Sequence, residues 1–346
     1  NVNNCGTCGK ACLSTQTCTN GVCINNPVTA SQIIADHTIV DRYDDIPQCY
    51  IDKVKTMWVS FPGESHSEGI RRGAELLEAR DSRYQVTVRL SGTPDPSTSS
   101  YLRLSGATWG DINNPTGWRY SYGEEDWWTT TAARTRTKAG LTYANSNGLS
   151  LSAIGLAWCW DMQAHPAVGS ETNIDPIYGV HWYGSSVGSP AGSVGWGLDD
   201  ADNTLSTRGQ TVNLDTYLSA TEEYRLYSLS QGYPTKVLFT TGTVDSIFAG
   251  EKGYQGYLKN ERIRNYVRAN KDRILFDYGD ILSYNDDGSS NFYTWNGHSY
   301  PLITSRNLGD ESIGHIGQEG AVRLAKAMWW TMARIAGWDG VSTTCN

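Results

Sequence analysis

Basic residues are the scarcer charged class in this chain, and long apolar runs are missing. Its 346 residues include 28 Lys and Arg against 36 Asp and Glu, which gives a net charge of −8. Nucleic-acid-binding proteins usually carry a basic surface, so that partner class is not expected. No apolar segment approaches the roughly 20 residues that a membrane-spanning helix needs. These absences indicate a globular protein with a weakly charged surface, because charged residues make up only 18% of the chain.

Phenylalanine is also rare, whereas tryptophan and tyrosine are abundant. The chain has 5 Phe, 13 Trp and 20 Tyr. Trp and Tyr combine an apolar ring with a polar group, so they suit surfaces that stack on sugar rings. They suit a large aromatic core equally well. The composition therefore leaves both interpretations open.

Five of the eight cysteines lie in the first 23 residues, in a segment too small for its own hydrophobic core. They are Cys5, Cys8, Cys12, Cys18 and Cys23. This density predicts a disulfide knot over residues 1–26 and an oxidising, extracellular location, with any signal peptide already removed. A zinc site is the rival, but the Cys5–Cys8 spacing is not repeated and no His lies nearby. Since five is odd, Cys49 and Cys345 are the expected partners for a knot cysteine.

Apolar strands alternate with amphipathic helices from residue 30 to residue 340. We expect strands at 55–61, 84–90, 149–160, 236–241 and 273–278, and helices at 68–80, 214–229, 261–269 and 320–336. This alternation predicts one α/β domain with a doubly wound parallel sheet, covered by helices on both faces. Two long stretches, 91–148 and 162–210, interrupt it. We expect these to be loop insertions that line a site or an interface.

A serine motif follows the first expected strand and opens the first helix. The segment Gly63–Gly69 (GESHSEG) places Ser65 on a turn at the carboxyl edge of the sheet, with its N–H at a helix N-terminus. Such a serine can act as a nucleophile, or it can simply cap the helix. The segment resembles the first block of the SGNH/GDSL hydrolase-like families, Gly-Asp-Ser-x-Ser/Thr-x-Gly, with Glu64 in place of the aspartate. The resemblance implies a flavodoxin-like fold with Ser65 as nucleophile.

A histidine motif stands immediately before the last helix, where the same families keep an Asp-x-x-His block. His315 matches the histidine, and the resemblance implies that it takes the proton of Ser65. Ser312 occupies the position of the aspartate. Asp310 or Glu311 would then orient the imidazole, and we assign this role to Asp310. Without such a partner the site would be a Ser–His dyad, or it would be inactive.

The oxyanion hole matches the families less well. The backbone N–H of Gly110 could act beside that of Ser65. The Gly-x-Asn-Asp block of the families would fall on Trp158–Asp161 (WCWD), which lacks both the glycine and the asparagine. We expect the N–H of Trp160 to replace the missing donor. Losing one oxyanion donor costs about 2.7–4 kcal/mol of barrier lowering.

The candidate substrate-binding residues are four tryptophans and an aspartate, most of them in or beside the two long stretches that interrupt the alternation. They are Trp109, Trp127, Trp128, Trp158 and Asp161. The carboxylates of Glu124–Asp126 beside Trp127 are also typical of a glycosidase, but a solvated acidic turn explains them more simply. No cofactor or transition metal is expected. The loops Asp199–Asp202 and Asn285–Gly288 could bind a structural calcium, although neither has the spacing of a calcium hand.

A broader resemblance covers most of the chain after residue 30. Segments such as Ile34–Thr38, Thr240–Asp245 and Ala327–Trp330 are similar to a group of secreted bacterial SGNH-like proteins, which often accompany polysaccharide-degrading systems. Residues 1–26 resemble small Cys-rich modules beside secreted bacterial enzymes. The resemblance implies a serine esterase that removes O-acyl groups, above all acetyl, from a polysaccharide. The alternative is a non-catalytic carbohydrate-binding or self-associating surface-assembly protein on the same scaffold.

Overall fold

The computed structural model divides the chain into two compact units, Asn1–Gln32 and Ile33–Asn346. It describes residues 16–19, 21–25, 31–63, 65–92, 94–109, 118–119, 127–128, 130–158, 174–182, 197–198, 213–244 and 249–345. In the first unit, β1 (Gln16–Thr19) and β2 (Val22–Asn25) pair antiparallel, with Cys18 opposite Cys23. Cys18 is disulfide-bonded. The knot cysteines Cys5, Cys8 and Cys12 lie outside the described residues.

The second unit is built on a seven-stranded sheet in the order β3-β11-β10-β9-β4-β6-β5, and every neighbouring pair is parallel. The strands are β3 (Ile34–Ala35), β4 (Trp58–Ser60), β5 (Val86–Arg89), β6 (Leu102–Ser105), β9 (Leu151–Ile154), β10 (Lys236–Thr240) and β11 (Ile274–Phe276). Central strands of such a sheet are buried on both faces, which is why they read as continuous apolar runs. The predicted doubly wound α/β fold is confirmed.

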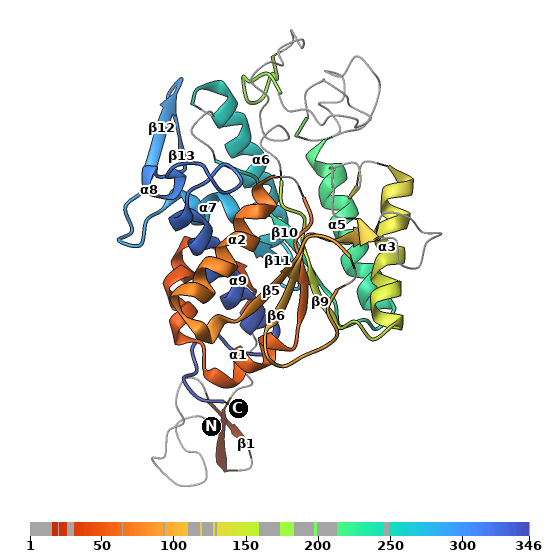
Figure 1. Ribbon diagram of the computed structural model, residues 1–346. Coiled ribbons are helices and arrows are strands. Elements are labelled where there is room, and N and C mark those ends of the chain that lie inside the picture. The colour runs from red at the N-terminus through yellow and green to blue at the C-terminus, as the bar shows by residue number, and fades with distance from the viewer. Residues whose placement is uncertain are drawn as a thin grey trace. The chain divides into compact units, whose positions relative to one another are not determined.

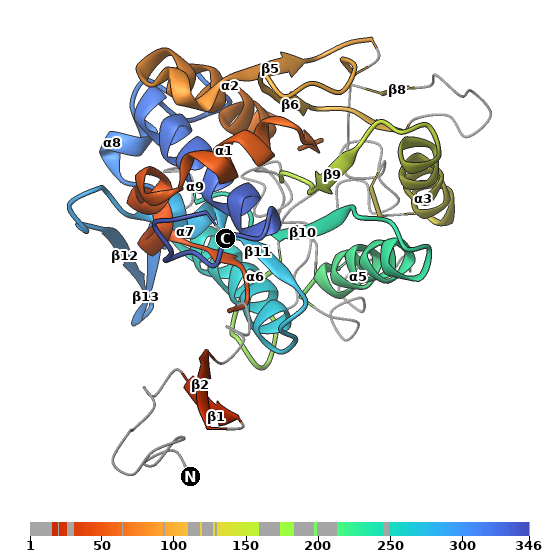
Figure 2. The same cartoon turned by 90° about the horizontal axis from the view of Figure 1, so that it is seen from below.

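Helices cover both faces of this sheet, as Figures 1 and 2 show. One layer holds η1 (His37–Asp45), α1 (Gln48–Lys55), α2 (Ser65–Arg80), α7 (Tyr278–Ser283) and α9 (Gln318–Ile335). The other holds α3 (Thr131–Ser146), α5 (Leu214–Ser230) and α6 (Glu251–Arg268). The smaller elements are η2 (Ser82–Tyr84), α8 (Ser305–Leu308), the pair β7 (Thr108–Trp109) and β8 (Trp118–Arg119), and the hairpin β12 (Asn291–Trp295) and β13 (His298–Leu302). None of the helices in the described ranges combines the length and the apolar character needed to cross a bilayer.

The stretch 91–148 is not the loop insertion that its sequence predicts. It contains β6, which is hydrogen-bonded between β4 and β5, and α3, which packs beside α5. The sheet therefore has a strand on the far side of β4 that the apolar pattern did not reveal.

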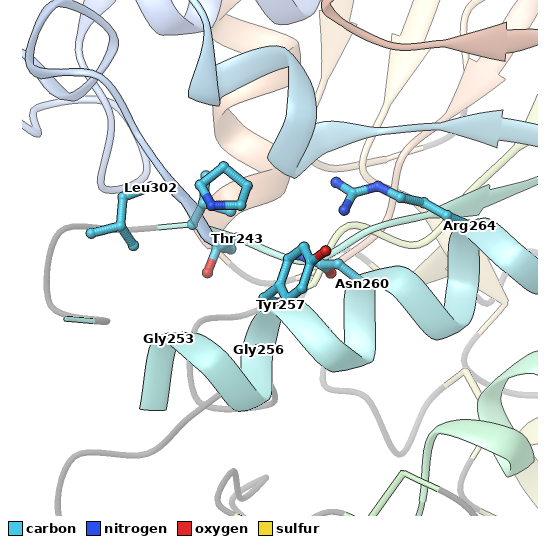
Figure 3. Close-up of a pocket in the computed structure, with 9 residues that line it drawn as sticks. Thr243, Gly253, Gly256, Tyr257, Asn260, Arg264 and Leu302 are labelled. Atoms are coloured by element: carbon cyan, nitrogen blue, oxygen red, sulfur yellow. The ribbon is translucent and has the colours of Figure 1, made fainter. Parts of the chain in front are cut away.

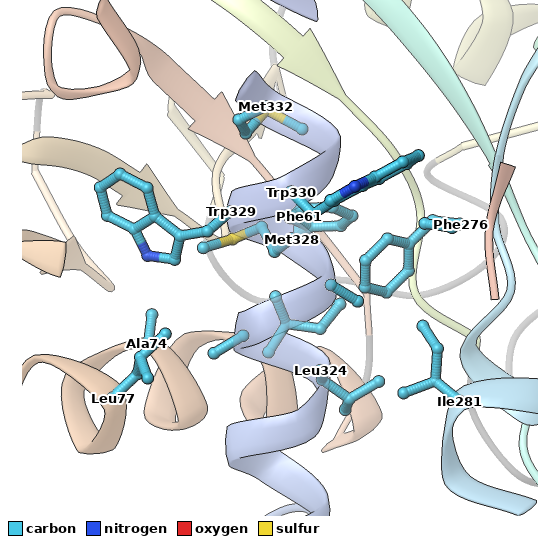
Figure 4. Close-up of a cluster of buried hydrophobic side chains, with 14 of the residues drawn as sticks. Phe61, Ala74, Leu77, Phe276, Ile281, Leu324, Met328, Trp329, Trp330 and Met332 are labelled. Atoms are coloured by element: carbon cyan, nitrogen blue, oxygen red, sulfur yellow. The ribbon is translucent and has the colours of Figure 1, made fainter. Parts of the chain in front are cut away.

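Two hydrophobic cores lie on the two sides of the sheet. The first core surrounds α9, whose side chains pack against α2 and the sheet. Figure 4 shows part of this core, including Phe61, Phe276 and Trp330. The second core is rich in aromatic rings, namely those of Trp58, Trp127, Trp128, Trp158, Trp182, Tyr217 and Tyr224. The abundant tryptophan of this chain therefore serves the core to a large extent.

A glycine allows α2 and α9 to touch backbone to backbone. A Cβ added to Gly73 would overlap the carbonyl oxygen of Ala321 on α9. In an isolated helix, Gly→Ala stabilises by about 1 kcal/mol. Here we expect Gly73→Ala to destabilise the protein by about 1–3 kcal/mol, the cost typical of overpacking, because neither backbone can move without shifting its helix. Urea unfolding measures this. Ala79→Gly on the exposed side of α2 is the control, since it reports helix propensity alone, and a stabilised Gly73→Ala variant would contradict the close contact.

A disulfide joins Cys49 on α1 to Cys345 near the C-terminus, with 6.1 Å between their Cα atoms. Both cysteines belong to the second unit. The expectation that they would pair with a cysteine of the knot is therefore wrong. The pairing follows from the packing of α9 against α1, which returns the chain end to the start of the domain.

Candidate active site

Ser65 lies at the switch point of the sheet. From β4, the chain builds β6 and β5 on one side, and it then continues with β9, β10 and β11 on the other. In open α/β sheets, ligands bind outside the carboxyl ends of the strands at such a point. Ser65 is the first residue of α2, five residues after the end of β4, and its side chain is half-buried. Its surroundings combine a helix N-terminus with partial access to solvent.

The turn that carries Ser65 depends on a glycine. Gly63 has φ = 142°, and it forms an isolated parallel bridge with Ala157, which follows β9. A Cβ at this position would overlap the carbonyl oxygen of Ala157. Glycine therefore lets the chain leave β4 against its neighbour and enter the helix at once.

Arg71 and Ser67 brace this turn from inside the helix. The Ser67 hydroxyl donates to the carbonyl oxygen of Gly63 at 3.2 Å. Arg71 Nη1 donates to Ser67 Oγ at 2.6 Å and to the carbonyl oxygen of Phe61 at 2.9 Å. Burial lowers the pKa of the Arg71 guanidinium to about 10, although Glu68 and Glu75 oppose the shift. Ser67 thus holds the backbone around Ser65.

The loop that carries His315 packs directly on the start of α2. A Cβ added to Gly314 would overlap the backbone oxygen of Ser65. His315 is exposed, with the left-handed φ of 68°, and its ring centroid lies 5.3 Å from that of the buried His66. His66 in turn meets the ring of Tyr278 edge-on at 5.9 Å. The structure therefore brings the Ser65 and His315 segments together, but within the described part of the chain no hydrogen bond joins the two side chains.

The carboxylate of Asp310 makes its hydrogen bonds within its own loop. It accepts hydrogen bonds from Ser312 Oγ at 2.7 Å and from the Ser312 N–H at 3.3 Å. These bonds lower the pKa of the Asp310 carboxyl. Both Asp310 and the alternative, Glu311, are exposed. These contacts stabilise the loop, and the role of Asp310 in orienting the imidazole of His315 stays a prediction.

The predicted oxyanion residues fall at different places. Gly110, Trp160 and Asp161 lie outside the described residues. Strand β9 ends at Ile154, so the segment that directly follows it is Gly155–Trp158 (GLAW). Trp158–Asp161 therefore does not directly follow the strand, and its part in an oxyanion hole stays a prediction. The apolar run misled the prediction because Leu156 and Trp158 continue into the second core after the strand has ended.

Three of the predicted substrate-binding tryptophans belong to the core. Trp127, Trp128 and Trp158 are at most 2% exposed. The indole N–H of Trp158 donates to the carbonyl oxygen of Thr240 at 3.0 Å, and its ring meets Tyr217 edge-on at 4.6 Å. Rings this deeply buried cannot stack on a sugar, which corrects the expectation that these three tryptophans bind substrate. Trp109 lies on β7.

A second polar cluster, which the sequence did not reveal as a site, lies at the carboxyl ends of β3 and β11. Asp36, His37 and Asp280 each offer one possible metal ligand, and these atoms lie within 4.8 Å of one another. His37 Nδ1 lies 2.6 Å from Asp280 Oδ2, while Asp36 accepts from the Thr38 N–H and hydroxyl. Burial and the neighbouring Asp277 raise the pKa of Asp280. The sequence signal for this cluster was the pair Asp36–His37 directly after a strand. Its carboxylate and imidazole groups are the ones that could hold a divalent cation.

Of the two candidate calcium loops, the one that the structure describes, 285–288, gives no comparable group. Asp286 forms ion pairs with Arg323 and Arg306, and Asp287 accepts from the Ser289 N–H at 2.9 Å. These carboxylates therefore have protein partners. Residues 199–202 and 124–126 lie outside the described residues.

Fold and site together define an open parallel α/β protein with a serine at the switch point of its sheet. No protein-family model matches the chain, and no curated protein matches it. Among solved structures, it is similar to one described as a lipolytic protein of the G-D-S-L family from Desulfitobacterium hafniense DCB-2. The two share 8% sequence identity over 81% of this chain and 99% of that chain, with a TM-score of 0.34. At this level of similarity, the chemistry of the site has to be argued from its own residues.

Proposed function

We propose that this protein is a serine esterase of the SGNH type that removes O-acyl groups, above all acetyl, from an extracellular polysaccharide. The observation that carries the proposal is the position of Ser65, at the N-terminus of α2 and at the switch point of the sheet, with the His315 loop packed on it. A helix N-terminus stabilises negative charge, which is what develops on an ester carbonyl under attack.

In the proposed reaction, Ser65 Oγ attacks the acyl carbon while His315 takes its proton. The carbonyl oxygen becomes an oxyanion, which the N–H groups at the start of α2 stabilise. When the bond to the sugar oxygen breaks, His315 returns the proton to that oxygen, and the acyl group stays on Ser65. A water then attacks the acyl carbon while His315 takes its proton, the bond to Ser65 Oγ breaks, and His315 returns the proton to that oxygen as the carboxylic acid leaves. The step requires the exposed imidazole to turn toward Ser65, since catalytic hydrogen bonds often form only with bound substrate.

The location and the substrate class rest on composition and on disulfides. Cys18 is bonded and Cys49 pairs with Cys345, and such bonds persist in oxidising compartments, which supports secretion. The net charge of −8 disfavours anionic polymers such as nucleic acids as substrates. A neutral, O-acylated polysaccharide agrees with both.

A second candidate is a carbohydrate-binding protein without catalytic activity. Trp158–Asp161 (WCWD) lacks the asparagine that the SGNH block would supply as a hydrogen-bond donor. Ser312 stands at the position of the family aspartate, and Asp310 is hydrogen-bonded to Ser312 in its own loop. A scaffold can persist after its chemistry is lost, and these two observations favour that outcome.

Covalent labelling separates the two candidates. We expect a fluorophosphonate probe to phosphonylate the wild-type protein, and peptide mass spectrometry should place the adduct on the tryptic peptide that contains Ser65. The same sample should release p-nitrophenol from p-nitrophenyl acetate and acetate from acetylated xylan. A folded protein that forms no adduct and hydrolyses neither ester would leave the binding protein as the function.

A further inference from the structure

A pocket outside the Ser65 site opens between α6 and the β12–β13 hairpin (Figure 3). It has about 280 Å³ of space not filled by protein atoms, part of it open to solvent. Gly253, Gly256, Tyr257, Asn260 and Arg264 line one side of it. Their spacing of three and four residues places them on one face of α6. The glycines leave the helix backbone as the wall, which makes room for a guest.

The inner end of the pocket holds a hydroxyl group that has no partner in the protein. Thr243 follows β10 and is 2% exposed, and its Oγ1 is buried without a hydrogen bond. Figure 3 shows this oxygen on the pocket side of the residue. Leaving a buried hydroxyl unpaired costs about 1–3 kcal/mol. A bound group that donates to Thr243 or accepts from it would recover this energy.

The polar groups of the pocket carry no uncompensated charge. Arg264 donates to both carboxylate oxygens of Asp277, at 2.7 and 2.8 Å, and to Glu261 at 2.8 Å. Asn260 Oδ1 accepts from the Gly242 N–H at 2.9 Å. The remaining walls, which include Pro301, are apolar. Such a lining suits a neutral guest with hydroxyl groups and disfavours an ion.

One aromatic ring, that of Tyr257, lines the pocket, and others lie close to its walls. Tyr257, half-buried, lies on the pocket wall, and burial raises the pKa of its phenol, which stays neutral. Phe292 on β12 is 51% exposed and pairs with Pro301 of the pocket wall. The ring of Tyr254 lies 6.3 Å from that of Tyr257 and stacks on His298 with ring centroids 4.2 Å apart. Exposed rings beside a hydroxyl-lined pocket combine an apolar face with hydrogen bonding.

We propose that this pocket binds a neutral saccharide, with one hydroxyl or hydroxymethyl group inside at Thr243 and a pyranose ring packed on Tyr257. The pocket as a whole has room for only about one water-sized group, which agrees with a single sugar hydroxyl. A pyranose has apolar C–H faces for the aromatic rings and hydroxyls for the threonine. The inference deepens the proposed function, since it names the glycan and its binding site, and to that extent it rests on it.

The test is equilibrium binding by the full-length Ser65→Ala protein, in which no ester turnover occurs. Isothermal titration calorimetry with xylohexaose, cellohexaose, mannohexaose and chitohexaose should show saturable binding of at least one. We expect Tyr257→Ala to weaken that binding about tenfold, since an aromatic contact is removed with its buried area. Thr243→Val keeps the shape and should weaken it about fivefold, the value of one hydrogen bond. Thr243→Val removes an unpaired hydroxyl, so its unfolding midpoint should not fall.

The matched control is Tyr233→Ala, which removes a half-buried ring from the turn after α5 and should bind as the parent does. The proposal is overturned if none of the four hexasaccharides binds, or if Tyr257→Ala and Thr243→Val bind as well as the parent. Ester hydrolysis by the wild type without such binding would support the esterase and contradict the saccharide pocket. Pocket-dependent binding without ester hydrolysis and without labelling of Ser65 would support the saccharide pocket and contradict the esterase.

Discussion

Ser65→Ala should lower kcat for p-nitrophenyl acetate hydrolysis by about 10³-fold or more, because no acyl-enzyme can form without the hydroxyl. What remains would come from binding and from oxyanion stabilisation by the N–H groups of α2. The substitution removes one half-buried oxygen from the first residue of a helix, so the fold should survive it. Stopped-time assays with p-nitrophenyl acetate and with acetylated xylan, alongside circular dichroism, measure both effects.

Ser67→Ala is the matched control for this experiment. Ser67 is buried and holds the turn through Gly63 and Arg71, so its loss should loosen the site and reduce kcat by about tenfold. The two serines stand two residues apart on the same turn, but only Ser65 is placed to react. Equal activity of the wild type and Ser65→Ala, with both folded, would contradict the esterase and support the binding protein.

The sheet could be predicted well where its strands are apolar. Strands β4, β9, β10 and β11 all fall inside predicted runs, and α5 and α9 agree with prediction to within two residues at each end. Their burial explains this, since a strand covered on both faces needs continuous apolar sequence. Helix α9 could be predicted because it packs along its length on the first core, which requires apolar residues at helical spacing.

Elements whose burial depends on hydrogen bonding were harder to predict. Strand β6 contains Arg103, which is 2% exposed and donates to the carbonyl oxygens of Asp95, Leu149 and Thr56. A buried arginine with backbone partners reads in the sequence as a surface residue, so the strand looked like a loop. Helix α6 begins at Glu251, ten residues before the predicted start. Its first turns were not predicted because Gly253 and Gly256 have low helix propensity.

The candidate site shows the same division. Ser65 and the position of His315 could be predicted because a short motif fixes each of them locally. The end of a strand and the pairing of cysteines depend on how distant segments meet, as with β9, which ends at Ile154, and the bond from Cys49 to Cys345. Local sequence does not determine those meetings, and the structure corrected each of them.

Arg264→Ala should destabilise the protein by about 3–5 kcal/mol, the cost of leaving a buried charge without its partner. Asp277, which is 1% exposed, is held by both Arg264 contacts and by the Thr241 hydroxyl at 2.8 Å. Burial alone would raise the pKa of the Asp277 carboxyl, but the attraction and hydrogen bonds of Arg264 lower it overall. Without the guanidinium, burial prevails, and the carboxylate must either remain charged in the core or take up a proton.

Arg262→Ala supplies the matched control, since it lies on α6 two residues earlier and pairs with Asp215 at 2.8 Å on the surface. That change should cost at most about 1 kcal/mol.

The two ion pairs also predict different pH dependence. In the wild type, the lowered pKa of Asp277 stabilises the fold above the unfolded value of about 3.9, and this contribution is lost as the pH falls below it. In Arg264→Ala the carboxyl pKa is raised, so the penalty should be largest at pH 7 and smaller near pH 4, where Asp277 is protonated. Urea unfolding of the three proteins at both pH values measures this, and equal losses for the two arginine variants would show that the buried pair is no more important than the exposed one.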